Sequence, residues 1–528
     1  MGSGLVGCSP SPRIPSDTSG ISTTITASST ASRRPNIVVF VADDHGEQAI
    51  SAYGRDLLQT PAIDRLATEG VRFANSFVSN AICAPSRAAL LTGAYSHRNG
   101  VLDNDTPLDG GQPTFPQVLQ AEGYRTALIG KWHLQSAPTG FDTYQILTGA
   151  FGQGKYYNPD FDEDGVVVRR EGYVTEILTE KALDFVRDAG DAPFLLLVHH
   201  KAPHRNWMPA LEHLGSVPEA SIEVPGTFFD DYATRALADG ADNKVRDLFL
   251  SQDMKLLPRH FGTETATGGH DGAQQDVEVA WADDRARMTD AQRAAWDRHY
   301  DPIGDAWAEA GLDGDALSVW KLRRYLADYL ATVRSLDDGV GHVLDYLEEA
   351  GLDEHTLVIY TSDQGFFLGE HGWYDKRWMY DPALRTPLLM RFPGRIQPGS
   401  VRDELVTNVD LAPTVLDVAD APVPAEVQGR SLGPLFRGPA PADWRQSIYY
   451  HYYDHPQGWH DVPKHFGVRT GTFKLIRFFN DAYSELFDLQ RDPHELENVY
   501  DDPDYRGVAE ELEAELSRLR RELGDQGY

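Results

Sequence analysis

The sequence predicts an α/β fold: a large, open, mixed but mostly parallel sheet flanked by helices, with a smaller C-terminal α+β subdomain built on an antiparallel sheet. Three observations support this class. Four short apolar runs rich in β-branched residues alternate with helical patterns, ionisable residues follow each run, and the pattern changes near residue 440 to short strands. A chain of 528 residues is long enough to bury a large core.

Residues 1–34 differ in composition from the rest and predict a flexible export or tether segment. They are rich in Ser, Thr, Gly and Pro, and such a segment buries too little apolar surface to offset the entropy of ordering. Leu5–Cys8 resembles a lipoprotein box, in which the cysteine is lipidated after export, but no basic start and apolar core precede it. Either the sequence starts late or the resemblance is chance. We expect export to the periplasm or the extracellular space, with Cys8 as the candidate lipid anchor.

The four apolar runs predict neighbouring parallel strands whose carboxyl ends carry the functional residues. The runs span residues 36–42, 126–129, 193–198 and 356–361. The ionisable and amide residues that follow them are Asp43 and Asp44, Lys131 and His133, His204, and Asp363 and Gln364. Because ligands of open α/β sheets bind beyond the carboxyl ends of the strands, we expect these side chains to meet there.

The remaining segments complete two predicted domains. The catalytic domain spans residues 35–438, and apolar residues at helical spacing predict a long helix or a kinked pair over 318–349, with Gly339 and Gly341 permitting close packing. Residues 215–315 are polar, acidic and less periodic, and we expect an insertion with loop segments such as 263–275. The C-terminal subdomain spans 439–528, with antiparallel strands expected over 447–453, 466–479 and 483–489 and a helix over 508–524.

Composition and charge exclude several classes of function. The net charge of −32 argues against nucleic acid as a partner, because nucleic-acid-binding proteins need a basic surface. No apolar run is long enough to span a bilayer, so no transmembrane segment is expected. The two cysteines are Cys8 and Cys83, and because Cys8 lies in the tether we expect no structural disulfide. Cys83 is therefore available for chemistry.

The stretch CAPSRAALLTG, which begins at Cys83, resembles the signature of the type I, formylglycine-dependent sulfatases of the alkaline phosphatase superfamily. In that family a formylglycine-generating enzyme oxidises the cysteine to formylglycine, and the resulting aldehyde is the catalytic group. The resemblance extends over about residues 35–510 and implies an alkaline-phosphatase-like fold and a sulfuric ester hydrolase. The other family motifs occur here in the family's order, at Asp43-Asp44, Lys131 and His133, His204, Asp363-Gln364, and Lys376.

The acidic motifs indicate a metal site. Carboxylates of Asp43, Asp44 and Asp363, with the amide oxygen of Gln364, form an all-oxygen donor set suited to Ca²⁺ and less well to Mg²⁺. Taken singly, each pair could equally be a helix cap or a turn after a strand. The resemblance implies one Ca²⁺ per chain, with the modified Cys83 as a further ligand. The family usually carries Asn or His at the position of Gln364, so this ligand departs from the family pattern.

The resemblance also implies a two-stage mechanism. A hydroxyl of the hydrated formylglycine attacks sulfur with the help of Ca²⁺ and Asp363. His204, assisted by Lys376, protonates the departing oxygen, and His133 then takes a proton from the second hydroxyl so that sulfate leaves.

Two cations, Arg87 and Lys131, are expected to hold the sulfate oxygens and balance charge. Without the motifs, these two residues and Lys376 would be interpreted as surface charges. Pro85 favours a first helical turn, so a helix beginning near Cys83 should point its amino end at the sulfate.

The substrate class follows from two further segments. HKAPHRNWMP and PTGFDTYQILTGAFGQGKYYNPDF resemble bacterial sulfatases that act on N-acetylglucosamine-6-sulfate, a sugar of mucin, keratan and heparan chains. We therefore expect a sulfated saccharide substrate, with 6-O-sulfated N-acetylglucosamine as the leading candidate. His465 and Arg469 are expected to reach the pocket from the C-terminal subdomain as substrate-binding residues.

Three alternatives remain open on sequence alone. A phosphonate or phosphodiester hydrolase of the same superfamily would share the aldehyde and metal site, and activity on aryl sulfates against aryl phosphodiesters distinguishes it. A non-catalytic binder of sulfated glycans would result if Cys83 were not converted, which protein mass reveals. A structural surface lipoprotein would leave the ionisable residues after the four strands unexplained.

Overall fold

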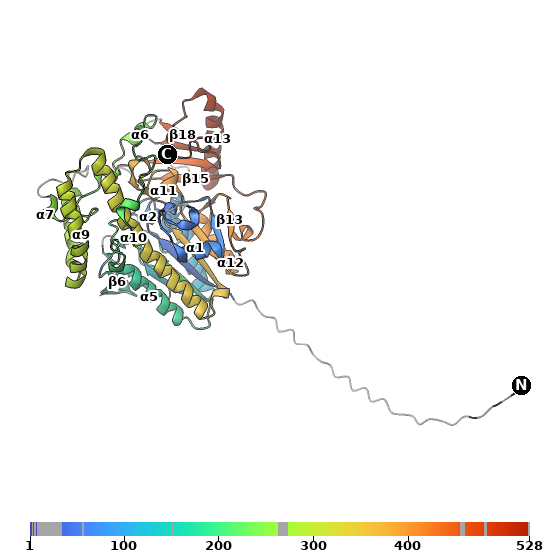
Figure 1. The fold of residues 1–528 in the computed structure, drawn as a ribbon. Coiled ribbons are helices and arrows are strands. Elements are labelled where there is room, and N and C mark those ends of the chain that lie inside the picture. The colour runs from blue at the N-terminus through green and yellow to red at the C-terminus, as the bar shows by residue number, and fades with distance from the viewer. Residues whose placement is uncertain are drawn as a thin grey trace. The chain divides into compact units, whose positions relative to one another are not determined.

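A computed structural model of the chain describes residues 34–528 except 55–56, 150–151, 262–272, 455–459, 480–482 and 526–528, and at the N-terminus residues 1, 2, 4 and 7. Cys8 and the predicted lipid anchor therefore lie outside the described residues. Residues Arg34–Tyr528 form one compact unit (Figure 1). Among the described residues, no helix is both long and apolar enough to cross a membrane.

A ten-stranded sheet forms the centre of this unit. Its strand order is β13-β2-β12-β9-β1-β8-β4-β5-β6-β7, and the five strands from β9 to β5 run parallel. The four predicted strands are the adjacent strands β9, β1, β8 and β4, which confirms the mostly parallel sheet. The strands are β1 (Asn36–Ala42), β2 (Val71–Phe73), β4 (Arg125–Gly130), β5 (Thr143–Leu147), β6 (Asp160–Glu163), β7 (Val166–Arg169), β8 (Phe194–His199), β9 (Thr356–Ser362), β12 (Leu388–Arg391) and β13 (Ser400–Arg402).

Helices cover both faces of the sheet because its central strands are apolar on both sides. In β1, Val38 and Phe40 belong to one core cluster, and Ile37 and Val39 belong to another. The first face is covered by α1 (Pro61–Thr68), α5 (Val174–Arg187) and α10 (Gly314–Glu349). The second is covered by α2 (Cys83–Thr92), α4 (Phe115–Ala121) and α12 (Leu411–Val418), with the short α3 (Ser96–Asn99) after α2.

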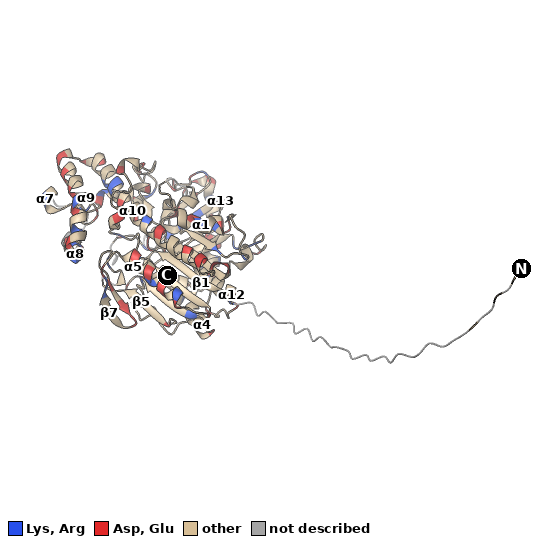
Figure 2. Cartoon of the chain, turned by 60° about the horizontal axis from the view of Figure 1, so that its bottom comes forward, with Lys and Arg blue, Asp and Glu red and all other residues tan. Residues whose placement is uncertain are grey.

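The long helix predicted over 318–349 is one continuous helix, α10. Its two glycines allow neighbouring helices to approach closely. A Cβ at Gly339 would lie 2.5 Å from Thr179 Oγ1 of α5, and a Cβ at Gly341 would lie 3.2 Å from Ala62 of α1. In Figure 2 the acidic segments, drawn red, recur along outer helices such as α9 (Asp290–Ala310) and α10, in keeping with the net charge of −32.

The insertion contains more helix than the sequence predicted. Residues 215–315 include α6 (Ala236–Asp239), α7 (Pro258–Phe261), α8 (Ala273–Arg287) and α9. Most of the predicted loop, residues 263–272, lies outside the described residues. The helical periodicity of α9 is weak because its apolar contacts depend on a few aromatic residues: Trp296 packs against Tyr157, and Tyr300 packs against Trp296.

The C-terminal segment forms a separate four-stranded antiparallel sheet, as predicted. Its strands are β15 (Ser447–Tyr452), β16 (His465–Thr470), β17 (Phe473–Phe478) and β18 (Ser484–Asp488), paired in that order. Helix α13 (Arg506–Leu523) packs on this sheet through Leu512 and Leu516. Two small sheets, β10 (Phe367–Leu368) with β11 (Tyr374–Asp375) and β3 (Ser76–Phe77) with β14 (Val406–Thr407), and helix α11 (Asp381–Leu384) complete the unit.

Candidate active site

The carboxyl edge of the parallel strands brings the predicted site residues together. Asp43 follows β1, Lys131 follows β4 and Asp363 follows β9, and the loop after β8 carries His204. Backbone hydrogen bonds connect the strand ends, from Lys131 N to His199 O (2.7 Å) and from Asp363 N to Ala42 O (3.1 Å). The sheet therefore fixes the relative positions of these side chains before any ligand binds.

Glycine is required just before Lys131. Gly130 has φ +108°, and a Cβ there would lie 1.9 Å from the carbonyl oxygen of His199. Only a residue without a side chain lets β4 turn beside β8 at this point. This turn delivers Lys131 into the site.

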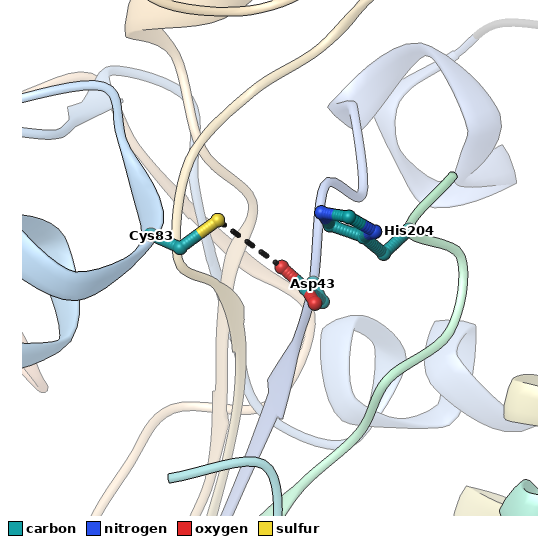
Figure 3. Close-up of side chains that lie close together, drawn as sticks. All are labelled: Asp43, Cys83 and His204. Carbon is teal, nitrogen blue, oxygen red and sulfur yellow. Dashed lines mark hydrogen bonds between the residues drawn. The ribbon is translucent and has the colours of Figure 1, made fainter. Parts of the chain in front are cut away.

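Cys83 occupies the first turn of α2, at the centre of the cluster. Its side chain is buried, with Sγ 3.6 Å from Asp43 Oδ1 and 3.4 Å from Lys376 Nζ. Figure 3 shows the sulfur pointing to the Asp43 carboxylate, with the His204 ring nearby. Burial raises the pKa of the thiol to about 11, so the unmodified side chain is a neutral thiol at pH 7.

The rest of the CAPSR motif attaches α2 to the strand ends. The Ser86 hydroxyl donates a hydrogen bond to the Asp363 carbonyl. Arg87 donates from Nε to Asp363 Oδ2 at 3.0 Å and from a terminal nitrogen to the Lys131 carbonyl at 3.1 Å. The motif therefore holds the first turn of α2, and Cys83 with it, against the acidic cluster.

Three buried carboxylates form the acidic cluster. Oxygens of Asp43, Asp44 and Asp363 lie within 4.8 Å of one another. Gln364 lies beside them, its Nε2 donating to Asp44 Oδ1, and its Oε1 has no hydrogen-bond partner among the described residues. Burial and the Asp43 charge raise the pKa of Asp363 to about 7. Such a set of crowded hard oxygens, one of them unpartnered, fits a divalent cation of the Ca²⁺ type.

Three cations balance the three carboxylates. Lys131 Nζ lies 2.5 Å from Asp43 Oδ2, Lys376 Nζ lies 2.5 Å from Asp44 Oδ1, and an Arg87 nitrogen lies 2.8 Å from Asp363 Oδ2. Although burial opposes it, these cations hold the pKa of Asp43 well below its usual range. A bound divalent cation would make the cluster net positive, which favours an anionic substrate.

The two site histidines lie on different parts of the cluster. His204 Nε2 is 3.7 Å from Asp44 Oδ2, and His204 Nδ1 donates to the carbonyl of Arg205 at 2.6 Å. His133 Nε2 is 3.3 Å from Gln153 Nε2. Burial, together with nearby lysines, lowers the pKa of both histidines, which keeps them neutral without bound anions.

His465 and Arg469 do not join this cluster, which corrects the prediction that they bind the substrate. His465 is fully buried in β16, stacks on Trp378, and accepts a hydrogen bond from Met379 N at 3.1 Å. Arg469 binds Asp381 through two nitrogens at 3.0 and 2.9 Å. Arg469 joins the C-terminal sheet to α11 and His465 joins it to the segment just before α11, structural roles that the predicted strand pattern did not reveal.

A polar group beside Lys376 escaped the sequence reasoning. Asp375 lies 2.6 Å from Arg377 and 2.8 Å from His460 Nε2, and both residues flanking Lys376 have positive φ, 75° and 84°. Asp375 and Arg377 are adjacent to Lys376 in the HGWYDKR stretch, and this adjacency is a signal that could have identified them. His460 carries no sequence signal, because it comes from a distant loop.

The fold and this cluster define a hydrolase of charged esters, and the comparisons give its family. The chain belongs to the sulfatase family, whose model matches residues 35–421, and it is a sulfuric ester hydrolase. A model described as N-sulphoglucosamine sulphohydrolase, C-terminal, matches residues 369–522.

Three matches to similar proteins each cover nearly the whole chain. An N-acetylglucosamine-6-O-sulfatase of Bacteroides thetaiotaomicron is 44% identical over 499 residues, covering 93% of this chain and 87% of that protein. A solved sulfatase-like structure in complex with its substrate D-glucosamine-2-N,6-O-disulfate has a TM-score of 0.89 and 44% identity, covering 94% of this chain and 99% of that chain. A phosphonate monoester hydrolase of Agrobacterium radiobacter has a TM-score of 0.68 at 21% identity, covering 93% and 96%, and shares the fold.

Proposed function

We propose that this sulfatase removes the 6-O-sulfate of N-acetylglucosamine in a mucin or glycosaminoglycan chain, using formylglycine at position 83 and one Ca²⁺. The observation that carries the proposal is the position of Cys83, buried in the first turn of α2 between Asp43 and Lys376. The 44% identity to an N-acetylglucosamine-6-O-sulfatase supports the choice of sugar.

Modification of Cys83 is part of the proposal because the unmodified thiol is poorly suited to the reaction. A neutral buried thiol is a weak nucleophile, and a thiolate beside three carboxylates would be repelled by the sulfate it must attack. Hydrated formylglycine, made by a formylglycine-generating enzyme, would instead supply one hydroxyl for attack on sulfur and a second for its release. Asp43, Asp44, Asp363 and Gln364 would hold the Ca²⁺, which would supply positive charge at the sulfate oxygens and the nucleophile.

The cations and α2 bind and orient the sulfate. Lys131 forms an ion pair with Asp43 and Arg87 forms one with Asp363, so their positive charges are fixed beside the site of attack at Cys83. The amino end of α2 adds the positive end of the helix dipole. These groups act on the sulfate, which every substrate shares.

His204 and Lys376 assist the departing sugar oxygen in this proposal, and His133 accepts a proton during release of sulfate. The bound sulfate brings negative charge to the cluster, which favours the protonated form of His204 that its buried surroundings otherwise disfavour. Lys376 has the opposite tendency, since Asp44 offsets burial and raises its pKa well above the usual range. Lys376 therefore stays charged.

The sugar is proposed to lie against Asp375, Arg377 and His460. Asp375 and Arg377 flank Lys376 in the sequence, His460 contacts Asp375, and Arg377 Nε has no hydrogen-bond partner among the described residues. A carboxylate, a guanidinium and an imidazole provide both donors and acceptors, as sugar hydroxyls require.

Export is also proposed, with Cys8 as the lipid anchor, on the basis of the sequence.

A panel of defined sulfated sugars tests the proposed function. We expect sulfate release from 6-O-sulfated N-acetylglucosamine to exceed release from 3-O-sulfated N-acetylglucosamine by at least about 10²-fold in kcat/KM, because only one position places the departing oxygen at His204. An aryl phosphodiester serves as the control for the phosphonate hydrolase alternative. Faster cleavage of the phosphodiester, or of a sulfate at another sugar position, would contradict the proposal.

Removal of the metal is expected to abolish activity, and Ca²⁺ is expected to restore it. Because Ca²⁺ binds the site only in the folded chain, it should also stabilise the fold, by about 2.7 kcal/mol at 100 times its dissociation constant. Activity and thermal unfolding after exhaustive chelation, with metal analysis, measure both effects. Asp363→Asn is the control and should lose most of the Ca²⁺-dependent rise in melting temperature. Full turnover in metal-free enzyme would refute the metal assignment.

A further inference from the structure

The backbone around His204 controls which of its nitrogens carries the proton. His204 Nδ1 donates to the carbonyl of Arg205 at 2.6 Å, which leaves Nε2 facing Asp44 and the cluster. Tyr156 donates from its hydroxyl to the His204 carbonyl at 2.6 Å. The orientation of the Arg205 peptide therefore decides whether Nε2 is the nitrogen offered to a ligand.

Arg205 is in turn held by the insertion. Its guanidinium binds Asp253 through two parallel contacts, Nε to Oδ1 at 2.8 Å and a terminal nitrogen to Oδ2 at 2.5 Å. Asp253 is fully buried and also accepts a hydrogen bond from Phe249 N at 2.8 Å. A bidentate, buried carboxylate–guanidinium pair has a fixed geometry, so it can define the position of the chain that carries it.

The same arginine reaches the segment that carries Lys376. A terminal nitrogen of Arg205 lies 3.3 Å from the hydroxyl of Tyr374, two residues before Lys376. Lys255, also from the insertion, donates to the Asn206 carbonyl at 2.6 Å. Two residues of the insertion, Asp253 and Lys255, therefore hold the two residues that directly follow His204. Arg205 also connects this loop with β11.

We propose that Asp253 is a positioning residue for the leaving-group step: through Arg205 it holds His204 with Nδ1 on the Arg205 carbonyl and Nε2 toward the departing oxygen. This rests on the proposed role of His204. In that step an oxygen of the hydrated formylglycine at position 83 bonds to sulfur while the S–O bond to the sugar breaks, and the electron pair of the broken bond stays on the sugar oxygen. That oxygen takes the proton from Nε2 of protonated His204, which becomes neutral and keeps its Nδ1–H on Arg205. The insertion thereby gains a function in catalysis.

The test compares two sulfate esters in an Asp253→Asn variant. We expect kcat/KM for 6-O-sulfated N-acetylglucosamine to fall by about 10–100-fold, because a misplaced acid protonates a sugar alkoxide poorly. For nitrophenyl sulfate, whose phenolate leaves without full protonation, we expect a fall of less than about 3-fold. In a His204→Ala background the same substitution should add less than about 3-fold on the sugar, because the acid it positions is already gone.

Asp230→Asn is the matched control. Asp230 forms a buried carboxylate–guanidinium pair with Arg235 in the same insertion, and its other hydrogen bonds among the described residues go to His371 and Tyr232 rather than to Arg205 or His204. We expect it to change both substrates by the same factor. Asp253→Glu, which keeps the charge, should recover part of the activity on the sugar, and thermal unfolding of each variant reports on folding.

Three results would overturn the proposal. The first is an equal fall in kcat/KM for both esters in Asp253→Asn. The second is an undiminished fall of about 10–100-fold when Asp253→Asn is added to His204→Ala. The third is a fall in Asp230→Asn that is much larger for the sugar than for nitrophenyl sulfate. Failure of the proposed function shows itself differently, as wild-type enzyme that releases no sulfate from 6-O-sulfated N-acetylglucosamine. In that case the sulfated sugar that the wild type does cleave replaces it in the comparison.

Discussion

Replacing Cys83 with alanine is expected to lower the rate of sulfate release by at least about 10⁴-fold, as loss of a covalent nucleophile typically does. This large effect follows from the position of the Cys83 side chain. Cys83 is the residue of α2 whose side chain lies between Asp43 and Lys376, and alanine cannot be converted to an aldehyde. Release of sulfate from the sugar and from nitrophenyl sulfate should fall alike, because both need the same nucleophile.

The control for this variant is its folding. Loss of one buried sulfur removes few contacts, so the melting temperature without added Ca²⁺ should stay close to that of the wild type. An alanine variant that keeps more than a few per cent of activity would show that another group attacks the sulfur. An inactive variant that is also unfolded would require comparison at a lower temperature.

The second large effect is expected for His204→Ala, and it should depend on the leaving group. Loss of a general acid typically costs about 10²–10⁴ in rate, and we expect that range for 6-O-sulfated N-acetylglucosamine. The fall in kcat/KM should be much smaller for nitrophenyl sulfate, because the departing nitrophenolate needs less proton transfer in the transition state. Values of kcat/KM for the two substrates provide the measurement.

Arg87→Ala is the comparison variant for this experiment. Arg87 contacts Asp363 and the Lys131 carbonyl, so it acts on the metal site and the sulfate that both substrates share. It should lower both rates by similar factors. If His204→Ala also lowers both rates equally, His204 belongs to sulfate binding and its assignment to the leaving group is wrong.

The sheet and most of the cluster were predictable from local sequence. Each of the strands β1, β4, β8 and β9 is a short apolar run, and parallel strands place their carboxyl ends at one edge, so Asp43, Lys131, His204 and Asp363 had to be neighbours. The periodic apolar residues over 318–349 predicted a long helix or a kinked pair, and the structure has the single helix α10. In these segments one physical cause, burial on both faces or along one stripe, determines both the sequence pattern and the structure.

The errors arose where contacts between distant segments decide the role of a residue. His465 and Arg469 are polar residues in a strand, and only the packing of that strand against Trp378 and Asp381 shows that they face the interior. The charge pair of Arg205 and Asp253 joins residues 48 positions apart. A polar insertion gives no periodic signal for such pairs, so its link to His204 could not be predicted.

The mass of the peptide that contains Cys83 tests the central claim most directly. In active enzyme we predict the aldehyde in place of the thiol, and across preparations converted to different extents we predict that kcat rises in proportion to the aldehyde fraction. Fully active enzyme whose Cys83 is entirely thiol would contradict the account.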